Sequence, residues 1–109
     1  RITPRIVSSA STTPQPDMST TDQYNATGIA GSTSFLSPVG SPTDGQKLII
    51  RILDDGTARA LTWTTSSGGY RVVGTTLPTT TVASKIIYVG CIYNTAAGFW
   101  DVVAVTTQS

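Results

Sequence analysis

Residues 44–64 read DGQKLIIRILDDGTARALTWT, with two β-patterned runs on either side of the turn signal Asp54-Asp55-Gly56-Thr57. In the first run, the Leu and Ile residues at positions 48, 50 and 52 share one face, and Lys47 and Arg51 lie on the other. This alternation is typical of a strand with one face in water. Asp-Gly supplies the positive backbone dihedrals of tight turns. We therefore expect a β-hairpin over residues 46–64.

The composition favours strands over helices. The chain has 109 residues, with no His and no Glu, and Ser and Thr together occupy 32 positions. Thr and Val fit a pleated, half-buried surface better than a helix. A chain of this length forms one domain with a single core. The composition therefore predicts a single, all-β domain.

Further β-patterned segments follow one another between turn residues, without a helical period. They are residues 1–7, 24–30, 34–36, 70–73, 85–93 and 99–106. Pro4 confines the first of them to an edge or to a strand start. The last two are joined by Asn94–Gly98, which predicts a second hairpin. Short strands at this spacing indicate an antiparallel two-sheet β-sandwich, jelly-roll-like, with an extended N-terminal arm.

The chain divides by composition into two parts. Residues 1–21 are expected to form an edge strand and an extended arm, and residues 22–109 the sandwich domain. The segment Ser8–Thr21 is built largely from Ser, Thr and Pro and has too little apolar surface to fold alone. It is a linker, an extended arm or a loop that lies on a neighbour.

The C-terminal hairpin is apolar on both faces, which is more burial than one face of a two-layer sandwich requires. One explanation is that its second face packs against other copies of the chain. The other is that residues 8–43 of the same chain cover it.

The distribution of charged and apolar residues argues against two classes of partner, nucleic acids and membranes. The net charge is +1, and the Lys and Arg residues are scattered singly rather than clustered. A nucleic-acid groove needs basic clusters with interleaved aromatic residues. No stretch approaches the 18 apolar residues of a membrane span. We therefore expect neither nucleic-acid binding nor membrane insertion.

Catalytic and cofactor chemistry is not indicated by the residue types present. Without His or Glu, neither a Ser-His-Asp triad nor a Cys-His pair can form, and one cysteine cannot build a zinc site. Cys91 lies in an apolar run and is expected to be buried. Asp44, Asp54 and Asp55 suggest a Ca²⁺ site, but their spacing matches no calcium loop, and turn formation is the favoured role. We predict no catalytic residues, no metal and no cofactor.

Four residues are candidates for contact with a glycan or a partner: Trp63, Tyr70, Trp100 and Asn94. Phe99 and Trp100 are neighbours on a strand, so one of them points outward unless it is covered. An exposed indole beside Asn94 or Asp101 suits stacking on a sugar ring. Packing of these rings in the core or in a subunit contact is the alternative.

The chain also resembles a module of tailed-bacteriophage virion structural proteins. The resemblance lies in the runs TTDQY at 20–24, SPTDGQKLIIRI at 41–52, DGTARALTW at 55–63, YR at 70–71, LPTTTV at 77–82, YVGCIYN at 88–94 and WDVVAV at 100–105. These runs stand in the same order as in that module. The resemblance covers nearly the whole chain from about residue 2 onward.

The resemblance implies a non-enzymatic component on the virion surface, made in the bacterial cytoplasm. It implies a β-sandwich, a homotrimer and contacts with other virion proteins, as a fibre or appendage tip domain or a capsid decoration protein. The arm Ser8–Thr21 would then clasp a neighbouring subunit. The alternative function is binding of host-surface carbohydrate through Trp63 or Trp100. Hydrolysis of a surface polymer is a third, less favoured hypothesis.

Overall fold

The structure is a computed structural model, and it describes residues 3–109. It contains eight strands and, within these residues, no helix. The strands are β1 (Ile6–Ser9), β2 (Gln23–Ile29), β3 (Thr33–Phe35), β4 (Lys47–Asp54), β5 (Leu61–Trp63), β6 (Tyr70–Val72), β7 (Ile87–Asn94) and β8 (Phe99–Thr107). The prediction of an all-β fold is confirmed.

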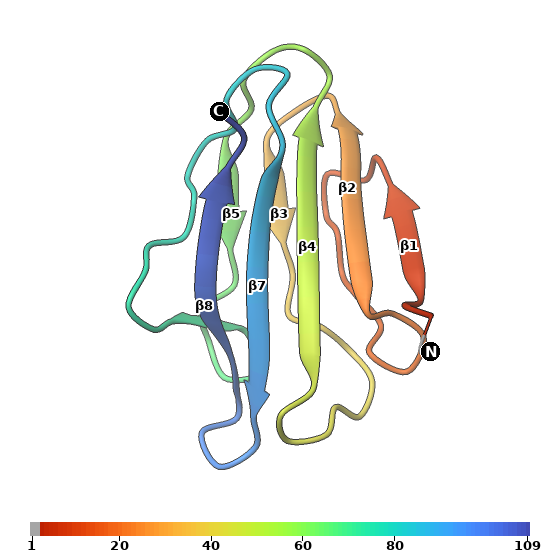
Figure 1. Ribbon diagram of the computed structural model, residues 1–109, viewed down its shortest axis with the longest axis vertical. Helices are drawn as coiled ribbons and strands as arrows, with labels where there is room; N and C mark the ends of the chain where they lie inside the picture. Colours follow the sequence, from red (N-terminus) through yellow and green to blue (C-terminus); the bar gives the residue numbers. More distant parts are fainter. Residues whose placement is uncertain (1–2) are drawn as a thin grey trace.

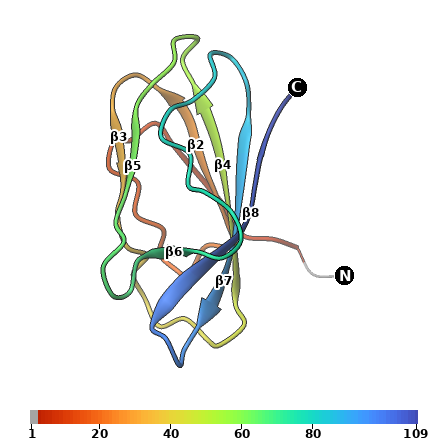
Figure 2. The same cartoon turned by 90° about the vertical axis from the view of Figure 1, so that its left-hand side faces the viewer.

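The strands form two layers. Six of them make one sheet in the order β1-β2-β4-β7-β8-β6, and β3 and β5 make a second, two-stranded sheet. Figure 2 shows the small sheet facing the large one. Each strand of the large sheet turns alternate side chains toward the small sheet, as the burial of every second residue in β4 shows. The hydrophobic core fills the space between the layers.

The core is continuous and almost entirely aliphatic and aromatic. Its buried members are Met18, Tyr24, Ala26, Ile29, Phe35, Leu48, Ile50, Ile52, Leu61, Tyr70, Ile87, Val89, Cys91, Trp100 and Val102. These residues come from both layers and from seven of the eight strands, so that neither sheet is stable without the other.

The first half of the chain winds between the layers as a coil. It passes from β1 in the large sheet to residues 12–16 in the small layer, returns to β2, and then alternates through β3, β4 and β5 (Figure 1). Residues 12–16 lie beside β3, because Ser34 and Leu36 donate backbone hydrogen bonds to the carbonyls of Thr12 and Pro14. Successive passes in one layer therefore run parallel, as in a β-solenoid.

This coil corrects the expected antiparallel jelly-roll. The pairs β1·β2, β2·β4, β3·β5 and β6·β8 are parallel, and only β4·β7 and β7·β8 are antiparallel. Parallel neighbours need a crossover, and here the crossover is a pass through the opposite layer instead of a helix. Both antiparallel pairs involve β7, which lies in the second half of the chain.

The hairpin expected over residues 46–64 is wrong for the same reason. β4 and β5 belong to different sheets, and residues 55–60 carry the chain from one layer to the other. The side chain of Asp54 turns inward at the end of β4 and accepts hydrogen bonds from Thr81, Ser84 and Gly56. The turn signal is real, but it marks a crossing between layers.

The second predicted hairpin is confirmed. β7 and β8 pair along their whole length, and the amide of Gly98 donates to the carbonyl of Asn94 to close the loop. Gly98 has a φ of 73°, which a residue with a side chain rarely adopts. The strands predicted at 24–30, 34–36 and 70–73 are found within one or two residues of their expected bounds.

The N-terminal segment is a structural layer of its own fold and not a free arm. Pro14, Pro16, Met18 and Thr21 are buried, and Val39 donates a backbone hydrogen bond to the carbonyl of Pro16. The apolar surface that this segment lacks in sequence is supplied by the layer on which it lies. The first strand begins later than expected, at Ile6, and residues 1–2 of the predicted strand lie outside the described residues.

Candidate functional site

Two of the four predicted contact residues are in the core. Trp100 is 1 % exposed and Tyr70 is fully buried. The hydroxyl of Tyr70 donates to the carbonyl of Leu36 across the layers at 3.1 Å, and burial raises the pKa of this phenol well above its ordinary value. Because β6 and β8 are parallel neighbours in register, both rings face the small sheet. Neither ring can stack on a sugar in this structure.

Trp63 and Asn94 are partly exposed but have structural partners. The indole of Trp63 stacks on Phe35, with ring centroids 4.1 Å apart, and its N–H donates to the carbonyl of Pro78 at 2.8 Å. Asn94 donates to the carboxylate of Asp101 and accepts from the amide of Ala97, so that it shapes the hairpin loop. The four predicted residues therefore do not form one site.

A further candidate surface is the solvent side of the six-stranded sheet, which we call the outer face and to which the second apolar face of the C-terminal hairpin belongs. It faces the viewer in Figure 1. Strand register places the following residues on it: Ile6 and Ser8; Gln23, Asn25 and Thr27; Lys47, Ile49, Arg51 and Leu53; Tyr88, Gly90, Ile92 and Asn94; Phe99, Asp101, Ala104 and Thr106; and Arg71.

The outer face is apolar over much of its area. Ile6 is 54 % exposed and Tyr88 42 % exposed, while Ile49, Leu53 and Ile92 are half-buried. Val103 adds a further apolar side chain, which is 45 % exposed. It lies where the register of β8 shifts against β7. A sheet whose other face already packs on a core commonly carries polar residues here. Exposed apolar residues gathered on one face are typical of a contact surface.

The centre of the outer face is flat. Gly90 of β7 pairs with Ala104 of β8 and Ile49 of β4. A Cβ added at Gly90 would meet the Ala104 Cβ at 3.7 Å and the Ile49 Cδ1 at 3.8 Å, which are ordinary contact distances. Sterics therefore do not demand glycine at this position. The small side chains leave a level area between the larger residues Tyr88 and Ile92.

Polar groups lie at both sides of the outer face: the Arg71–Asp101 ion pair at the β6 side, and a row of uncharged groups at the β1 side. Gln23 donates to Asn25 at 2.9 Å, and Asn25 donates to the hydroxyl of Ser8 at 3.3 Å, which forms a row of amides across two strands. Lys47 and Arg51 stand next to this row on β4. Within residues 3–109, neither of these two cations has a carboxylate within ion-pair distance, so that this half of the outer face is positive.

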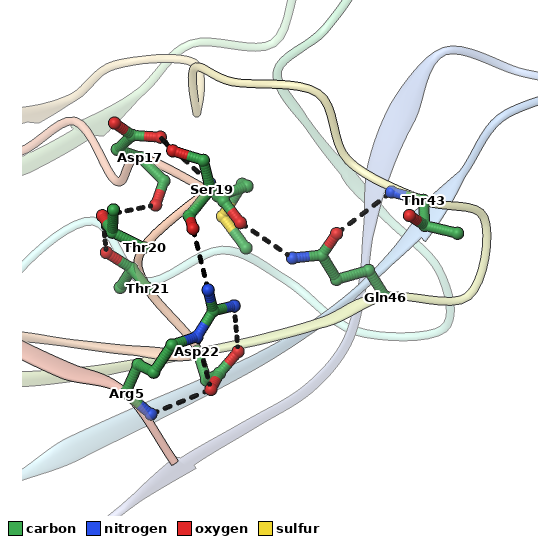
Figure 3. A network of polar contacts seen from close by, with 9 residues as sticks. Arg5, Asp17, Ser19, Thr20, Thr21, Asp22, Thr43 and Gln46 are labelled. Carbon is green, nitrogen blue, oxygen red and sulfur yellow. Dashed lines mark hydrogen bonds and ion pairs between the residues drawn. The ribbon is translucent and has the colours of Figure 1, made fainter.

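A network of polar contacts closes the corner below β1 and β2 (Figure 3). The guanidinium of Arg5 binds both carboxylate oxygens of Asp22 and the carbonyl of Ser19. These hydrogen bonds lower the pKa of Asp22 to about 2. Gln46 accepts from the amide of Thr43 and donates to the carbonyl of Met18, and thereby ties the loop before β4 to the same corner.

An open depression of about 460 Å³ adjoins this corner and is lined by Pro4, Asp22, Gln23, Gln46, Lys47 and Ile49. The side chains of Asp22, Gln23 and Gln46 already hydrogen-bond within the protein. The depression is therefore a consequence of the corner network, and we assign it no ligand.

The three aspartates considered for Ca²⁺ have separate partners. Asp54 accepts from Thr81, Ser84 and Gly56, and Asp55 pairs with Arg59 at 2.8 Å. Asp44 accepts from the amide of Thr95. In the part of the chain that the structure describes, no three His, Cys, Asp or Glu residues are grouped to hold a metal ion.

Comparison with known proteins identifies no match among family models, curated proteins or solved structures. Within residues 3–109, no helix is long and apolar enough to cross a membrane.

Proposed function

We propose that this chain is a non-enzymatic structural module on the surface of a tailed-phage virion, where it self-associates as a homotrimer. It serves as a fibre or appendage tip domain or as a capsid decoration protein, and it contacts other virion proteins. The resemblance of nearly the whole sequence to such modules supports this proposal. The resemblance is the basis for assigning the chain to a phage virion, for placing it on the surface of the particle and for expecting three copies.

The observation that carries the proposal is the outer face. A rigid sheet with one face on the core and exposed Ile6, Tyr88 and Val103 on the other side has surface to bury in an assembly. The flat Gly90–Ala104 area allows another surface to approach closely. Interfaces of this kind gain free energy from apolar area removed from water, which suits a part whose role is to hold a particle together.

Two measurements test this function. Light scattering after size exclusion is expected to give a mass three times that of the 11.4 kDa chain. Mass spectrometry of purified phage particles is expected to find the chain among the structural proteins. A chain that stays monomeric at high micromolar concentration would contradict the self-association. Its absence from washed particles would contradict the virion role.

The alternative function is binding of a host-surface glycan, and Tyr88 is the residue that favours it. Its ring is 42 % exposed on the outer face next to Arg51, and an aromatic face with neighbouring polar groups suits a sugar ring. Calorimetric titration with host polysaccharide would then give binding that Tyr88→Ala abolishes and Tyr88→Phe retains. Equal heats from all three proteins would reject this alternative.

A further inference from the structure

The six-stranded sheet has a free edge at β1. β1 is the first strand in the sheet order, and within residues 3–109 no segment pairs with its other side (Figure 1). The carbonyl of Arg5 accepts hydrogen bonds from Asp22 and Gln23, so Arg5, Val7 and Ser9 direct their backbone groups toward β2. Because these directions alternate along a strand, the N–H and C=O groups of Ile6 and Ser8 point to the open side.

A second free edge lies at the opposite side of the same sheet. β6 covers β8 only at Trp100, Asp101 and Val102, and one further backbone bond runs from Val73 to Val102. Beyond that point, and within the described residues 3–109, residues 104–107 of β8 pair with β7 alone, and Val103 is the unpaired residue of the bulge. Gln108 donates to the carbonyl of Ile86, which places the backbone groups of Val105 and Thr107 on the open side.

Neither edge is blunted by charged residues or by proline, although β1 has only four residues and β8 carries a bulge at Val103. Residues 6–9 and 103–107 contain no Lys, Arg, Asp, Glu or Pro. Native proteins blunt exposed edges with such residues or cover them. Ile6 and Val7, at 54 % and 38 % exposed, and Val103 instead present apolar side chains. Both edges are therefore competent to accept another strand.

The two edges also match in direction. β1, β2 and β4 are parallel, β7 is antiparallel to β4, and β8 is antiparallel to β7. β8 therefore runs the same way as β1. When two copies stand side by side in the same orientation, the β8 edge of one meets the β1 edge of the next as a parallel pair.

We propose that the free edge of β1 pairs in parallel with residues 103–107 of β8 from a second copy of this chain, so that the sheet continues head to tail from copy to copy. The proposal rests on the self-association in the proposed function and assigns it to the two sheet edges, which leaves the outer face free for contacts with other virion proteins. The contact is heterologous, and it closes into a ring if the rotation between copies allows it.

The register of the proposed β1–β8 pairing follows from the face of the sheet on which each residue lies. Ile6 and Ser8 lie on the outer face and would stand beside Ala104 and Thr106, which lie on that face of the neighbouring copy. Val7 would stand beside Val105, which packs against the core of its own chain. The pairing thus covers the exposed Val7 and makes the two cores continuous across the contact.

A cysteine pair tests this register. Ser8→Cys and Thr106→Cys in one chain would lie on adjacent strands about 4.8 Å apart, within the range that a disulfide bridges. Mild oxidation is expected to give a ladder of covalent multimers that ends at three chains. The native Cys91 is buried with its pKa raised to about 12, so it does not interfere. The matched control joins Thr106→Cys with Thr27→Cys, which is exposed on β2 away from the edge.

The outcomes are distinct. Multimers with the first pair and none with the control support the proposal. A dimer from Ser8→Cys alone would show that two β1 edges pair with each other, which overturns it. An unmodified chain that is trimeric by light scattering, but whose cysteine pair gives no ladder, would overturn the proposal and leave the proposed function standing. An unmodified chain that is monomeric would overturn both.

A proline variant provides a second test without new thiols. Ser8→Pro removes an N–H that points to the open side, so the pairing with β2 is kept and only the contact between copies is lost. Ser8→Ala is the matched control, since it loses the 3.3 Å bond from Asn25 but keeps the N–H. Ser8→Pro is expected to be a folded monomer and Ser8→Ala a trimer. Equal masses for the two variants would overturn the proposal.

Discussion

Asp54 holds the crossing from β4 to β5 with one buried carboxylate. It is 4 % exposed and accepts hydrogen bonds from the Thr81 hydroxyl at 2.7 Å, the Ser84 amide at 2.9 Å and the Gly56 amide at 3.0 Å. Burial by itself raises the pKa of Asp54, but the bonds from Ser84, Thr81 and Gly56 outweigh it and the pKa is lowered. The charged form is therefore the one that the fold stabilises.

Replacing this side chain tests its role. Asp54→Asn keeps the shape but removes the charge and turns an amide N–H toward groups that donate. We expect a loss of about 2 kcal/mol in the free energy of unfolding, the usual cost of breaking charge-assisted hydrogen bonds at a buried site. Urea denaturation measures this loss. Asp55→Asn, next along the chain but exposed, is the control, and an equal loss there would contradict the prediction.

At the scale of the element, strand β2 contains a bulge at Gly28. The register of β2 against β4 shifts between Thr27 and Ile29, and Gly28 has a φ of 67°. No atom lies within 4 Å of the position of an added Cβ, so the requirement for glycine is one of backbone conformation. Gly90 is the opposite case, because its φ is not positive and its neighbours leave room.

This contrast gives a matched pair of variants. Gly28→Ala is expected to lower the free energy of unfolding by about 1 to 2 kcal/mol, since an L-residue is strained in the left-handed region. Gly90→Ala is expected to leave it unchanged or to raise it by up to about 1 kcal/mol, because alanine loses less backbone entropy in a strand. Thermal unfolding followed by circular dichroism compares the two. A Gly90→Ala protein less stable than Gly28→Ala would refute this assignment.

The strands themselves could be predicted, whereas their partners could not. The alternation of Leu48, Ile50 and Ile52 located β4, and the apolar runs around Asn94–Gly98 located β7 and β8. The Asp-Gly signal at 55–56 indicated a turn, but a turn within a sheet and a crossing between layers begin with the same residues. The hydrogen bonds of Asp54 with Thr81 and Ser84 make this turn a crossing between layers. These partners lie 27 and 30 residues away, so no local sequence pattern contains them.

Most residues of the outer face could not be predicted from the sequence, for a similar reason. Trp100 was one of two neighbours that could point outward, and its pairing with Tyr70 of β6 and Tyr93 of β7 places it inside. Gly90 and Ala104 become neighbours through the register of β7 and β8. The apolar character of both faces of the C-terminal hairpin was visible in the sequence, and it was the one signal that pointed toward the outer face.

At the scale of the whole molecule, the coil makes residues 10–21 part of the fold. Deleting residues 1–9 removes only the edge strand and the Arg5–Asp22 pair. Deleting residues 1–21 also removes the buried Met18 and the strip that bonds to Ser34 and Leu36. We expect the shorter deletion to unfold cooperatively at a lower temperature and the longer one to show no cooperative transition. Two similar melting curves would contradict this.

The response to pH is also a property of the whole chain. With no His and no Glu, no side chain with an ordinary pKa titrates between pH 5 and 7, and the free energy of unfolding is expected to be flat there. Hydrogen bonds from Arg5 lower the pKa of Asp22 to about 2. A lowered carboxylate pKa gives stability that is present above the unfolded value of about 4 and is lost as the pH falls through 2.

Urea denaturation at pH 7, 5, 3 and 2 tests this profile. Stability is expected to fall between about pH 4 and 2, where Asp54 contributes in the same direction. Asp22→Asn is expected to be less stable than the wild type at pH 7. It is also expected to lose less stability on acidification, because it lacks the contribution of the Asp22 carboxylate at every pH. A variant that keeps the wild-type slope below pH 4 would contradict the assignment to Asp22.

The parallel course of β1 and β8 at opposite edges of the sheet also bears on mechanical load. β1 starts at the lower end of the sheet in Figure 1 and β8 finishes at the upper end. A pull between these two points acts along the strands, so each edge strand must slide past its neighbour with all its backbone bonds loaded together. Peeling, which breaks one bond at a time, is not available in that direction. In that direction the rate at which the module yields under tension is therefore set by its unfolding barrier.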